Sequence, residues 1–199
     1  MSVLILGGFL GSGKTTVLLK MAHYIADHYR GDGVPLVIVE NEIGEVSVDS
    51  SVLGGFQVRE LFSGCICCTL TADLAQNVQQ ICREYAPEYI LVETTGMACP
   101  EKAASVIRQY VPQAGPVEIL GLADAERWEE LMDFMDVFIA SQLGTARWIL
   151  LNKMDTVDVQ TVNRIRSQIG DINKTAEIFP VCAKHSLEKE LDCILGGWI

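Results

Sequence analysis

The fold of this chain is decided near its start, by the stretch Gly8-Phe9-Leu10-Gly11-Ser12-Gly13-Lys14-Thr15, which matches the pattern G-x-x-x-x-G-K-[ST] in full. The glycines leave room for backbone N–H groups to turn inward around a phosphate, and the N-terminus of a following helix faces the same anion. We expect Lys14 to reach the β- and γ-phosphates and the Thr15 hydroxyl to bind Mg²⁺. The residues predicted to hold the phosphates are Gly8, Gly11, Ser12, Gly13, Lys14, Thr15 and Thr16.

Beyond this phosphate loop, short apolar runs alternate with helical patterns along the chain. Strands are predicted at residues 3–6, 35–39, 89–92, 117–122, 148–151 and 178–181, and helices at 15–29, 70–84, 101–110, 126–142, 159–169 and 186–195. This alternation predicts an α/β fold of the P-loop NTPase class, with a mostly parallel central sheet and helices on both faces.

The segment after the second predicted strand does not fit this alternation. It carries Gly44, Gly54 and Gly55, and the stretch from Phe56 to Leu61 alternates like an exposed strand. We interpret residues 41–69 as a mobile insertion in a single domain that spans residues 1–199, and a hairpin is one interpretation of its alternating stretch.

Composition and charge exclude several classes of protein. Apolar residues make up 49% of the 199 positions, which is typical of a globular chain. The net charge of −11 disfavours binding to nucleic acid or to anionic membranes. No apolar run approaches the ~18 residues of a membrane span, and the start of the chain has no basic leader. Seven cysteines without a secretory leader predict a reducing compartment, the cytoplasm.

A group of acidic residues lies between the fourth predicted strand and the middle of the helix that follows it. A solvated helix face is the favoured interpretation, and a partner-binding surface is the alternative. Its members are Asp124, Glu126, Glu129, Glu130, Asp133 and Asp136.

The stretch Asn152-Lys153-Met154-Asp155 follows an apolar strand, at the edge where α/β sheets bind ligands. A carboxylate at Asp155 can accept hydrogen bonds from N1–H and the 2-amino group of guanine, whereas adenine would leave it poorly paired. The aliphatic stem of Lys153 can pack along the base plane. After the last predicted strand, Cys182 and Ala183 occupy the place where GTPases offer a backbone N–H to guanine O6. The predicted base-binding residues are Asn152, Lys153, Asp155, Cys182 and Ala183.

A further acidic motif, Glu93-Thr94-Thr95-Gly96, follows the third predicted strand. Its place is that of the second acidic motif of P-loop proteins, whose carboxylate orients Mg²⁺ or its waters. We therefore predict Thr15 and Glu93 as magnesium ligands, and Lys14, Thr15 and Glu93 as the catalytic residues. Gly96 would let the backbone approach a γ-phosphate and move away when it leaves.

Three thiols lie within four residues, at Cys65, Cys67 and Cys68. The chain has no second paired cluster, so a closed structural zinc site of the zinc-finger type is not expected. An open site suited to transient loading of a metal is the favoured interpretation. A redox pair and simple packing are the alternatives.

Carboxylates that could complete such a metal site follow the second predicted strand, at Glu40, Glu42 and Glu45. Thiolates together with carboxylates suit Zn²⁺, Co²⁺ or Ni²⁺. We expect Zn²⁺ first, with Co²⁺ or Ni²⁺ as alternatives, in addition to Mg²⁺ at the nucleotide. Isolated thiols at Cys82, Cys99 and Cys193 are interpreted as packing residues.

Five of these stretches follow one another in a fixed order, at residues 7–16, 40–46, 64–68, 93–100 and 152–155. Together they resemble the CobW-like P-loop GTPases, which are metallochaperones related to the GTPases that insert nickel into hydrogenase and urease. The resemblance extends from Gly7 to about Lys184. It implies a GTPase that binds a transition metal through Cys67 and its neighbours. It also implies that GTP hydrolysis gates transfer to a client metalloprotein, a metal-dependent biosynthetic enzyme or a cobalamin pathway.

Many members of that family carry a second, C-terminal domain, and we expect this chain to be the GTPase domain without it. A homodimer that depends on metal or nucleotide is a further expectation. Two other classes of function stay open at this point. One is a P-loop kinase of small molecules, which would prefer ATP. The other is a metal or redox sensor in which the nucleotide is only structural.

Overall fold

The computed structural model of this chain describes residues 1–32, 35–40, 57–60 and 70–197. Within these residues, seven strands form one sheet in the order β3-β2-β4-β1-β5-β6-β7, and every neighbouring pair is parallel. The strands are β1 Ser2–Gly8, β2 Leu36–Glu40, β3 Gln57–Glu60, β4 Tyr89–Glu93, β5 Val117–Asp124, β6 Trp148–Asn152 and β7 Glu177–Pro180. This sheet confirms the predicted parallel α/β fold of the P-loop NTPase class.

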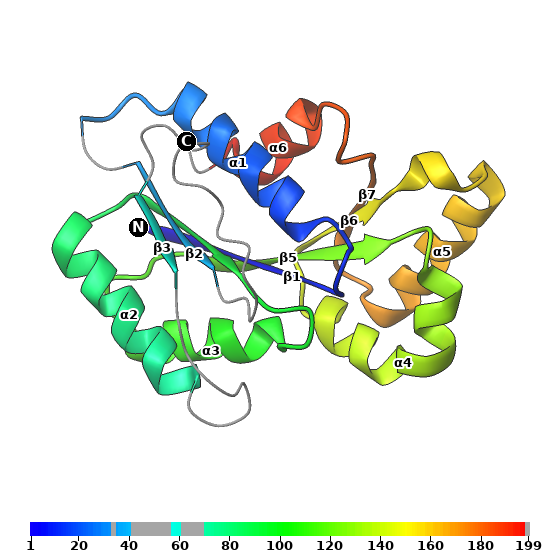
Figure 1. Ribbon diagram of the computed structural model, residues 1–199, viewed down its shortest axis with the longest axis horizontal. Helices are drawn as coiled ribbons and strands as arrows, with labels where there is room; N and C mark the ends of the chain where they lie inside the picture. Colours follow the sequence, from blue (N-terminus) through cyan, green and yellow to red (C-terminus); the bar gives the residue numbers. More distant parts are fainter. Residues whose placement is uncertain (33–34, 41–56, 61–69, 198–199) are drawn as a thin grey trace.

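Helices cover both faces of the sheet, as Figure 1 shows. The helices are α1 Lys14–His28, α2 Leu70–Tyr85, α3 Pro100–Tyr110, α4 Trp128–Leu143, α5 Val159–Ile172 and α6 Glu188–Leu195, with a short 3₁₀ helix η1 at Met154–Thr156. α1 and α6 lie on one face, and α2 to α5 lie on the other. Within the described residues, no helix combines the length and the apolar character needed to cross a membrane.

The sheet divides the core into two layers, as the side chains of its central strand β1 show. Successive side chains of a strand point to opposite faces, so Val3 and Ile5 pack toward α2 to α5 while Leu4 and Leu6 pack toward α1 and α6. β1 is buried along almost its whole length, because strands in a parallel sheet are covered on both sides. This burial holds the carboxyl ends of β1, β4, β5 and β6 side by side at one edge.

Part of the alternating stretch within the expected insertion forms a strand that pairs in parallel with β2, whereas a hairpin pairs its strands antiparallel. Gln57–Glu60 forms β3, which pairs in parallel with β2 at the edge of the main sheet, with Val37 opposite Gln57 and Glu40 opposite Glu60. The hairpin interpretation is therefore wrong for these four residues. A period of two residues indicates an extended strand but carries no information on the direction of its partner. The rest of the expected insertion, residues 41–56 and 61–69, lies outside the described residues.

Candidate nucleotide site

The phosphate loop connects the end of β1 to the start of α1, so it lies at the carboxyl edge of the sheet. Gly13 precedes α1 with φ of 100°, in the left-handed region that favours glycine. A Cβ at Gly13 would lie 2.5 Å from Nδ2 of Asn152, so a side chain here would also displace the base motif. The predicted glycine pattern thus has a steric cause in this structure.

Two buried hydroxyl groups, one on the phosphate loop and one on the loop after β4, lack a hydrogen-bond partner within the described residues. They are the Oγ of Ser12 and the Oγ1 of Thr95. A buried, unpaired polar group costs about 1–3 kcal/mol. Phosphate oxygens and magnesium-bound waters are groups that would satisfy these hydroxyls. Lys14 is also buried at the start of α1, which places its charge in the same region.

Thr15 and Glu93, the predicted magnesium ligands, are in direct contact. The Oγ1 of Thr15 donates a hydrogen bond of 3.0 Å to Oε1 of Glu93. Glu93 is buried as the last residue of β4, where the sheet register places it beside Leu6 of β1. A hydroxyl and a carboxylate at one point are the hard oxygen ligands that Mg²⁺ prefers, so these two residues fit the ion.

The loop after β4 packs directly on the phosphate loop. Thr94 donates a side-chain hydrogen bond of 2.8 Å to the carbonyl oxygen of Leu6. At Gly96, a Cβ would lie 2.7 Å from the backbone nitrogen of Leu10, so only glycine allows this approach. The loop after β4 is therefore placed to respond to a group bound at the phosphate loop.

Asn152 connects the phosphate loop to the base-binding segments. Its Nδ2 donates to the carbonyl oxygen of Ser12, and its Oδ1 accepts from the backbone N–H of Ala183, each at 2.8 Å. Both contacts are buried. The N–H of Ala183, one of the two residues at the place where GTPases offer a backbone N–H to guanine O6, is thus bonded to Asn152 in this structure.

Lys153 is held by a carboxylate that the sequence analysis interpreted differently. The Lys153 Nζ lies 2.7 Å from Asp124 Oδ2 and 3.2 Å from Glu126 Oε2. Burial lowers the pKa of Lys153, but the hydrogen bonds and charges of these two carboxylates outweigh it and raise the pKa. Asp124 ends β5 and is buried, so the interpretation of a solvated helix face is wrong for this residue.

Asp155 and Cys182 lie next to each other on the outer side of the site. Asp155 is exposed on η1, and a hydrogen bond from the Cys182 thiol is the main cause that lowers the pKa of its carboxyl group. Its own backbone N–H and the charges of Lys184 and His185 act in the same direction. The carboxylate therefore stays ionised, and thus a hydrogen-bond acceptor, below the usual pKa of an aspartate.

Gln142 is a residue of this site that the sequence analysis missed. It is buried on α4, where its Oε1 accepts a 2.8 Å hydrogen bond from the backbone N–H of Gly8 and its Nε2 donates to the carbonyl oxygen of Ala98. One side chain thus joins the phosphate loop to the loop after β4. A glutamine on the same helix face as Ile139 and Leu143 was the signal available in the sequence.

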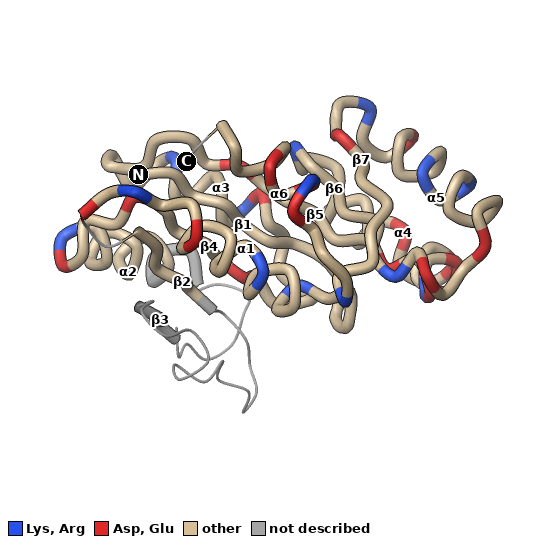
Figure 2. Tube along the Cα trace, turned by 90° about the horizontal axis from the view of Figure 1, so that it is seen from above, with Lys and Arg blue, Asp and Glu red and all other residues tan. Residues whose placement is uncertain are grey.

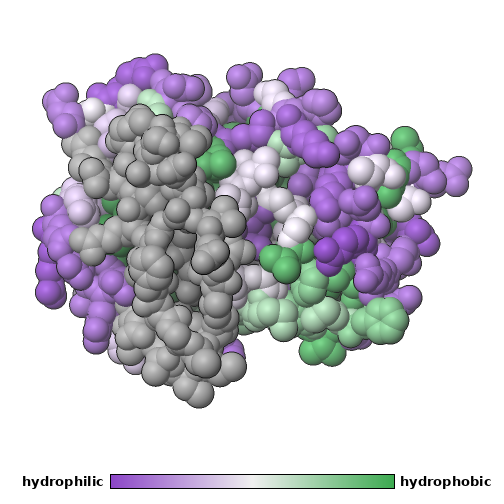
Figure 3. Space-filling model, in the orientation of Figure 1, coloured by the Kyte–Doolittle hydropathy of each residue, from purple (hydrophilic) through white to green (hydrophobic). Residues whose placement is uncertain are grey.

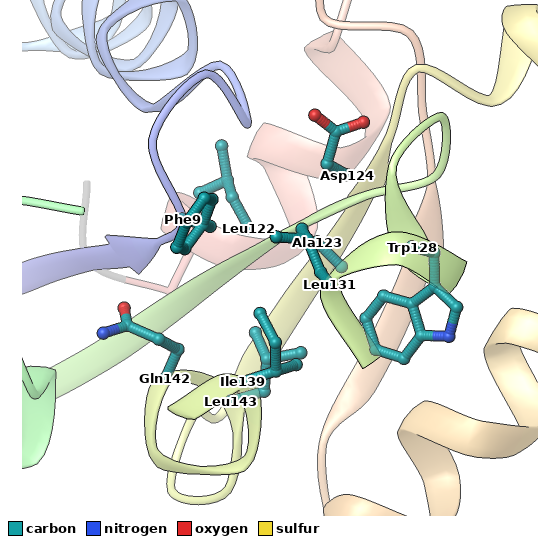
Figure 4. A pocket seen from close by; sticks show the side chains of 9 residues that line it. All are labelled: Phe9, Leu122, Ala123, Asp124, Trp128, Leu131, Ile139, Gln142 and Leu143. Atoms are coloured by element: carbon teal, nitrogen blue, oxygen red, sulfur yellow. The ribbon is translucent and has the colours of Figure 1, made fainter. Parts of the chain in front are cut away.

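The small pocket drawn in Figure 4 lies behind the phosphate loop, between α4 and β5. Its volume is about 10 Å³, which is enough for about one water molecule and far too little for a nucleotide. The pocket is therefore a packing space and not the nucleotide site. Its lining residues are Phe9, Leu122, Ala123, Asp124, Trp128, Leu131, Ile139, Gln142 and Leu143.

Of the six predicted transition-metal ligands, the described residues include Glu40 alone. Cys65, Cys67, Cys68, Glu42 and Glu45 lie outside the described residues. Glu40 ends β2, and its backbone is paired with that of Glu93 in the neighbouring strand. In the part of the chain that the structure describes, no group of three His, Cys, Asp or Glu residues could hold a metal ion.

A protein-family model described as "CobW/HypB/UreG, nucleotide-binding domain" matches residues 2–180. This chain belongs to that family. The match confirms the resemblance drawn from the five sequence stretches. The relatives of this chain include proteins named zinc chaperones and a solved structure named a GTPase.

This CobW/HypB/UreG domain covers only part of the length of the curated relatives it matches. The zinc chaperone YjiA of Escherichia coli is 30% identical over 192 residues, covering 90% of this chain and 57% of that protein. The zinc chaperone CobW of Sinorhizobium is 28% identical over 198 residues, covering 83% of this chain and 54% of that protein. The chain thus spans about half the length of these relatives.

Solved structures agree with the fold. The Zn(II)-bound YjiA GTPase from E. coli superposes with a TM-score of 0.64 at 27% identity, covering 91% of this chain and 57% of the other. The hydrogenase maturation factor HypB from Archaeoglobus fulgidus gives a TM-score of 0.69 at 15% identity, covering 100% of this chain and 91% of the other. The second likeness shows a shared fold.

For this CobW/HypB/UreG domain, we predict that Gln142→Leu lowers the free energy of unfolding by about 1–3 kcal/mol, because at nearly constant side-chain volume it leaves the buried N–H of Gly8 and the partly buried carbonyl of Ala98 without their partner. We also expect faster amide exchange at residues 94–98. Denaturant unfolding and hydrogen exchange measure these effects. Gln160→Leu, on the exposed side of α5, is the matched control. Equal losses of stability in both variants would show that Gln142 does not join the two loops.

Proposed function

We propose that this chain hydrolyses GTP and uses the hydrolysis to gate the transfer of a transition metal, Zn²⁺ first, to a client metalloprotein. The observation that carries the nucleotide part is the Asn152 side chain, which ties the phosphate loop to the segments that carry Asp155 and Cys182. Phosphate recognition and base recognition are thereby built into one edge of the sheet. The metal part is supported by the zinc chaperones among the relatives and by the Cys65, Cys67 and Cys68 cluster.

The phosphate end of the site has residues suited to hydrolysis. Lys14 supplies positive charge for the oxygens of the γ-phosphate, and the hydroxyls of Ser12 and Thr95 offer hydrogen bonds that nothing described in the protein uses. Thr15 and Glu93 would hold Mg²⁺, which supplies charge neutralisation between the phosphates when bound. Gly96 allows the backbone after β4 to lie against the phosphate loop, so loss of the γ-phosphate would be sensed there.

The base end favours guanine over adenine. An ionised Asp155 offers two acceptor oxygens, which pair with the N1–H and 2-amino donors of guanine and find no such pair on adenine. The ion pairs with Asp124 and Glu126 orient the Lys153 side chain. Its aliphatic stem is thereby available to pack along the plane of the base. A P-loop kinase would need ATP, which this arrangement does not match.

The metal part is coupled to the nucleotide part through adjacent strand ends. β2 and β4 are neighbours, and Glu40 is paired through its backbone with Glu93, the proposed magnesium ligand. The segment with the remaining proposed metal ligands, Glu42, Glu45 and the three thiols, begins directly after Glu40. A rearrangement around Glu93 on hydrolysis would thus act on the first residue of the metal-binding segment.

We predict that Asp155→Asn lowers the affinity for GTP and raises the relative affinity for XTP, because the 2-oxo group of xanthine is an acceptor that an amide can pair with. Competition binding with GTP, ATP and XTP measures this change. Asp171→Asn, an exposed position on α5, has the same change of charge and should leave the preference unaltered. An unchanged GTP preference in Asp155→Asn, or a parent that prefers ATP, would contradict the assignment of the base.

We further predict that Zn²⁺ affinity differs between the GDP form and the form with a non-hydrolysable GTP analogue by about 5- to 150-fold, a typical range for coupled sites. Cys67→Ala should weaken Zn²⁺ binding sharply and remove the difference while leaving nucleotide binding intact. Chelator competition in both nucleotide states gives the affinities, and Cys193→Ala, an exposed thiol on α6, is the control. Equal Zn²⁺ affinities of the parent in the two states would contradict gated transfer, even if GTP is hydrolysed.

A further inference from the structure

Helix α4 exposes large apolar side chains next to the phosphate loop. Phe134 is 83% exposed and Val137 is 79% exposed, the two highest values among the large apolar residues that the structure describes. They lie on either side of Met135 on α4, and both line the same open hollow. Figure 3 shows this apolar surface over α4. An open hollow of about 420 Å³ lies along it, lined by Phe134, Met135, Asp136, Val137, Phe138 and Ser141.

The backbone of α4 departs from helical geometry at the centre of this surface. Met135 has φ of −141° and ψ of 28°, so α4 is two helical segments joined at a kink. Trp128 and Leu131 before the kink, and Ile139 and Leu143 after it, all pack into the core. Both segments are thus anchored in the core by other side chains, and Phe134 and Val137 are not part of that core. Clustered apolar exposure of this kind marks a binding surface for another molecule.

The charges around this apolar surface indicate what kind of molecule would bind to it. Asp133 and Asp136 are exposed beside Phe134 and Val137, and neither makes an ion pair within the described part of the chain. In contrast, Glu129 is paired with Arg164 at 2.8 Å. Figure 2 shows the acidic residues along α4.

These charges argue against a second copy of this chain as the occupant. A two-fold contact through α4 would bring Asp133 and Asp136 against the same residues of the other copy, in a protein whose net charge is already −11. A segment with apolar side chains flanked by Lys or Arg would instead form ion pairs with these two carboxylates and cover the apolar side chains.

We propose that this face of α4, centred on Phe134 and Val137, is the docking surface for a basic, amphipathic segment of a partner protein. The surface lies close to the nucleotide site, because the ring of Phe138 packs edge-on against Phe9 of the phosphate loop at a centroid distance of 6.2 Å. Gln142, one turn further along α4, bonds to Gly8. A docked segment would therefore contact the helix that holds the phosphate loop. The docking itself does not rest on the proposed hydrolysis of GTP.

The test uses fluorescent helical peptides of about 18 residues, a length of some five turns. One peptide carries Leu on one face and Lys on the other, and two controls replace Lys by Glu or Leu by Ser. We expect the Leu/Lys peptide to bind the parent in an anisotropy titration. The double variant Phe134→Ser/Val137→Ser should lose about tenfold or more in affinity. Asp133→Asn/Asp136→Asn should weaken binding and reduce its dependence on salt.

Val159→Ser is the matched control, because Val159 is 74% exposed on α5 and lies outside the proposed surface. It should bind the peptide like the parent. The exchanged residues are all exposed, and circular dichroism checks that each variant is folded. Equal peptide affinity in the parent and in Phe134→Ser/Val137→Ser would overturn the proposal, as would equal affinity for the Leu/Glu peptide. Self-association of the parent that the same double variant abolishes would also overturn it, in favour of a second copy.

Discussion

The nucleotide site depends on the two hydrogen bonds of the Asn152 side chain. One amide reaches the carbonyl oxygen of Ser12 and the N–H of Ala183, so it connects residues 140 and 31 positions away in the sequence. Without the amide, two buried backbone groups would lose their partners, at a cost of about 1–3 kcal/mol each. Gly13 is required by the same contact, because a Cβ there would occupy the space of the Asn152 amide. The glycine pattern of the phosphate loop and the base motif are thus one steric and polar unit.

Secondary structure was predictable because each element carries its own periodic signal. The buried strands are continuous apolar runs, and the helices repeat their apolar positions at three and four residues. β3 shows where this reasoning ends: its alternation indicated a strand, while its parallel pairing with β2 depends on contacts that no local pattern contains. Asp124 shows the same limit, because it belongs to the end of β5 and not to the acidic face of α4 that follows it.

The residues of the site also fall into those that a local sequence motif predicts and those that only the structure reveals. Lys14, Thr15, Glu93 and Asn152 stand in motifs with fixed spacing, and the structure brings them to one edge of the sheet. Gln142 belongs to no motif. Its role depends on hydrogen bonds to the backbone of Gly8, which is 134 residues away in the sequence, and of Ala98. The thiols and Glu42 and Glu45 remain a prediction from sequence and family. Only the start of their segment, at Glu40, is tied to the described sheet.

α4 combines the two kinds of contact that a regulated nucleotide-binding domain needs. Its inner face holds the phosphate loop and the loop after β4 through Gln142, and its outer face leaves Phe134 and Val137 in solvent beside the carboxylates of Asp133 and Asp136. A molecule that binds one face of α4 can change the other only by moving a packed helix, and packed helices shift between discrete arrangements. Coupling between docking and nucleotide binding would therefore depend on the contact between Phe138 and Phe9, where the exposed surface meets the phosphate loop.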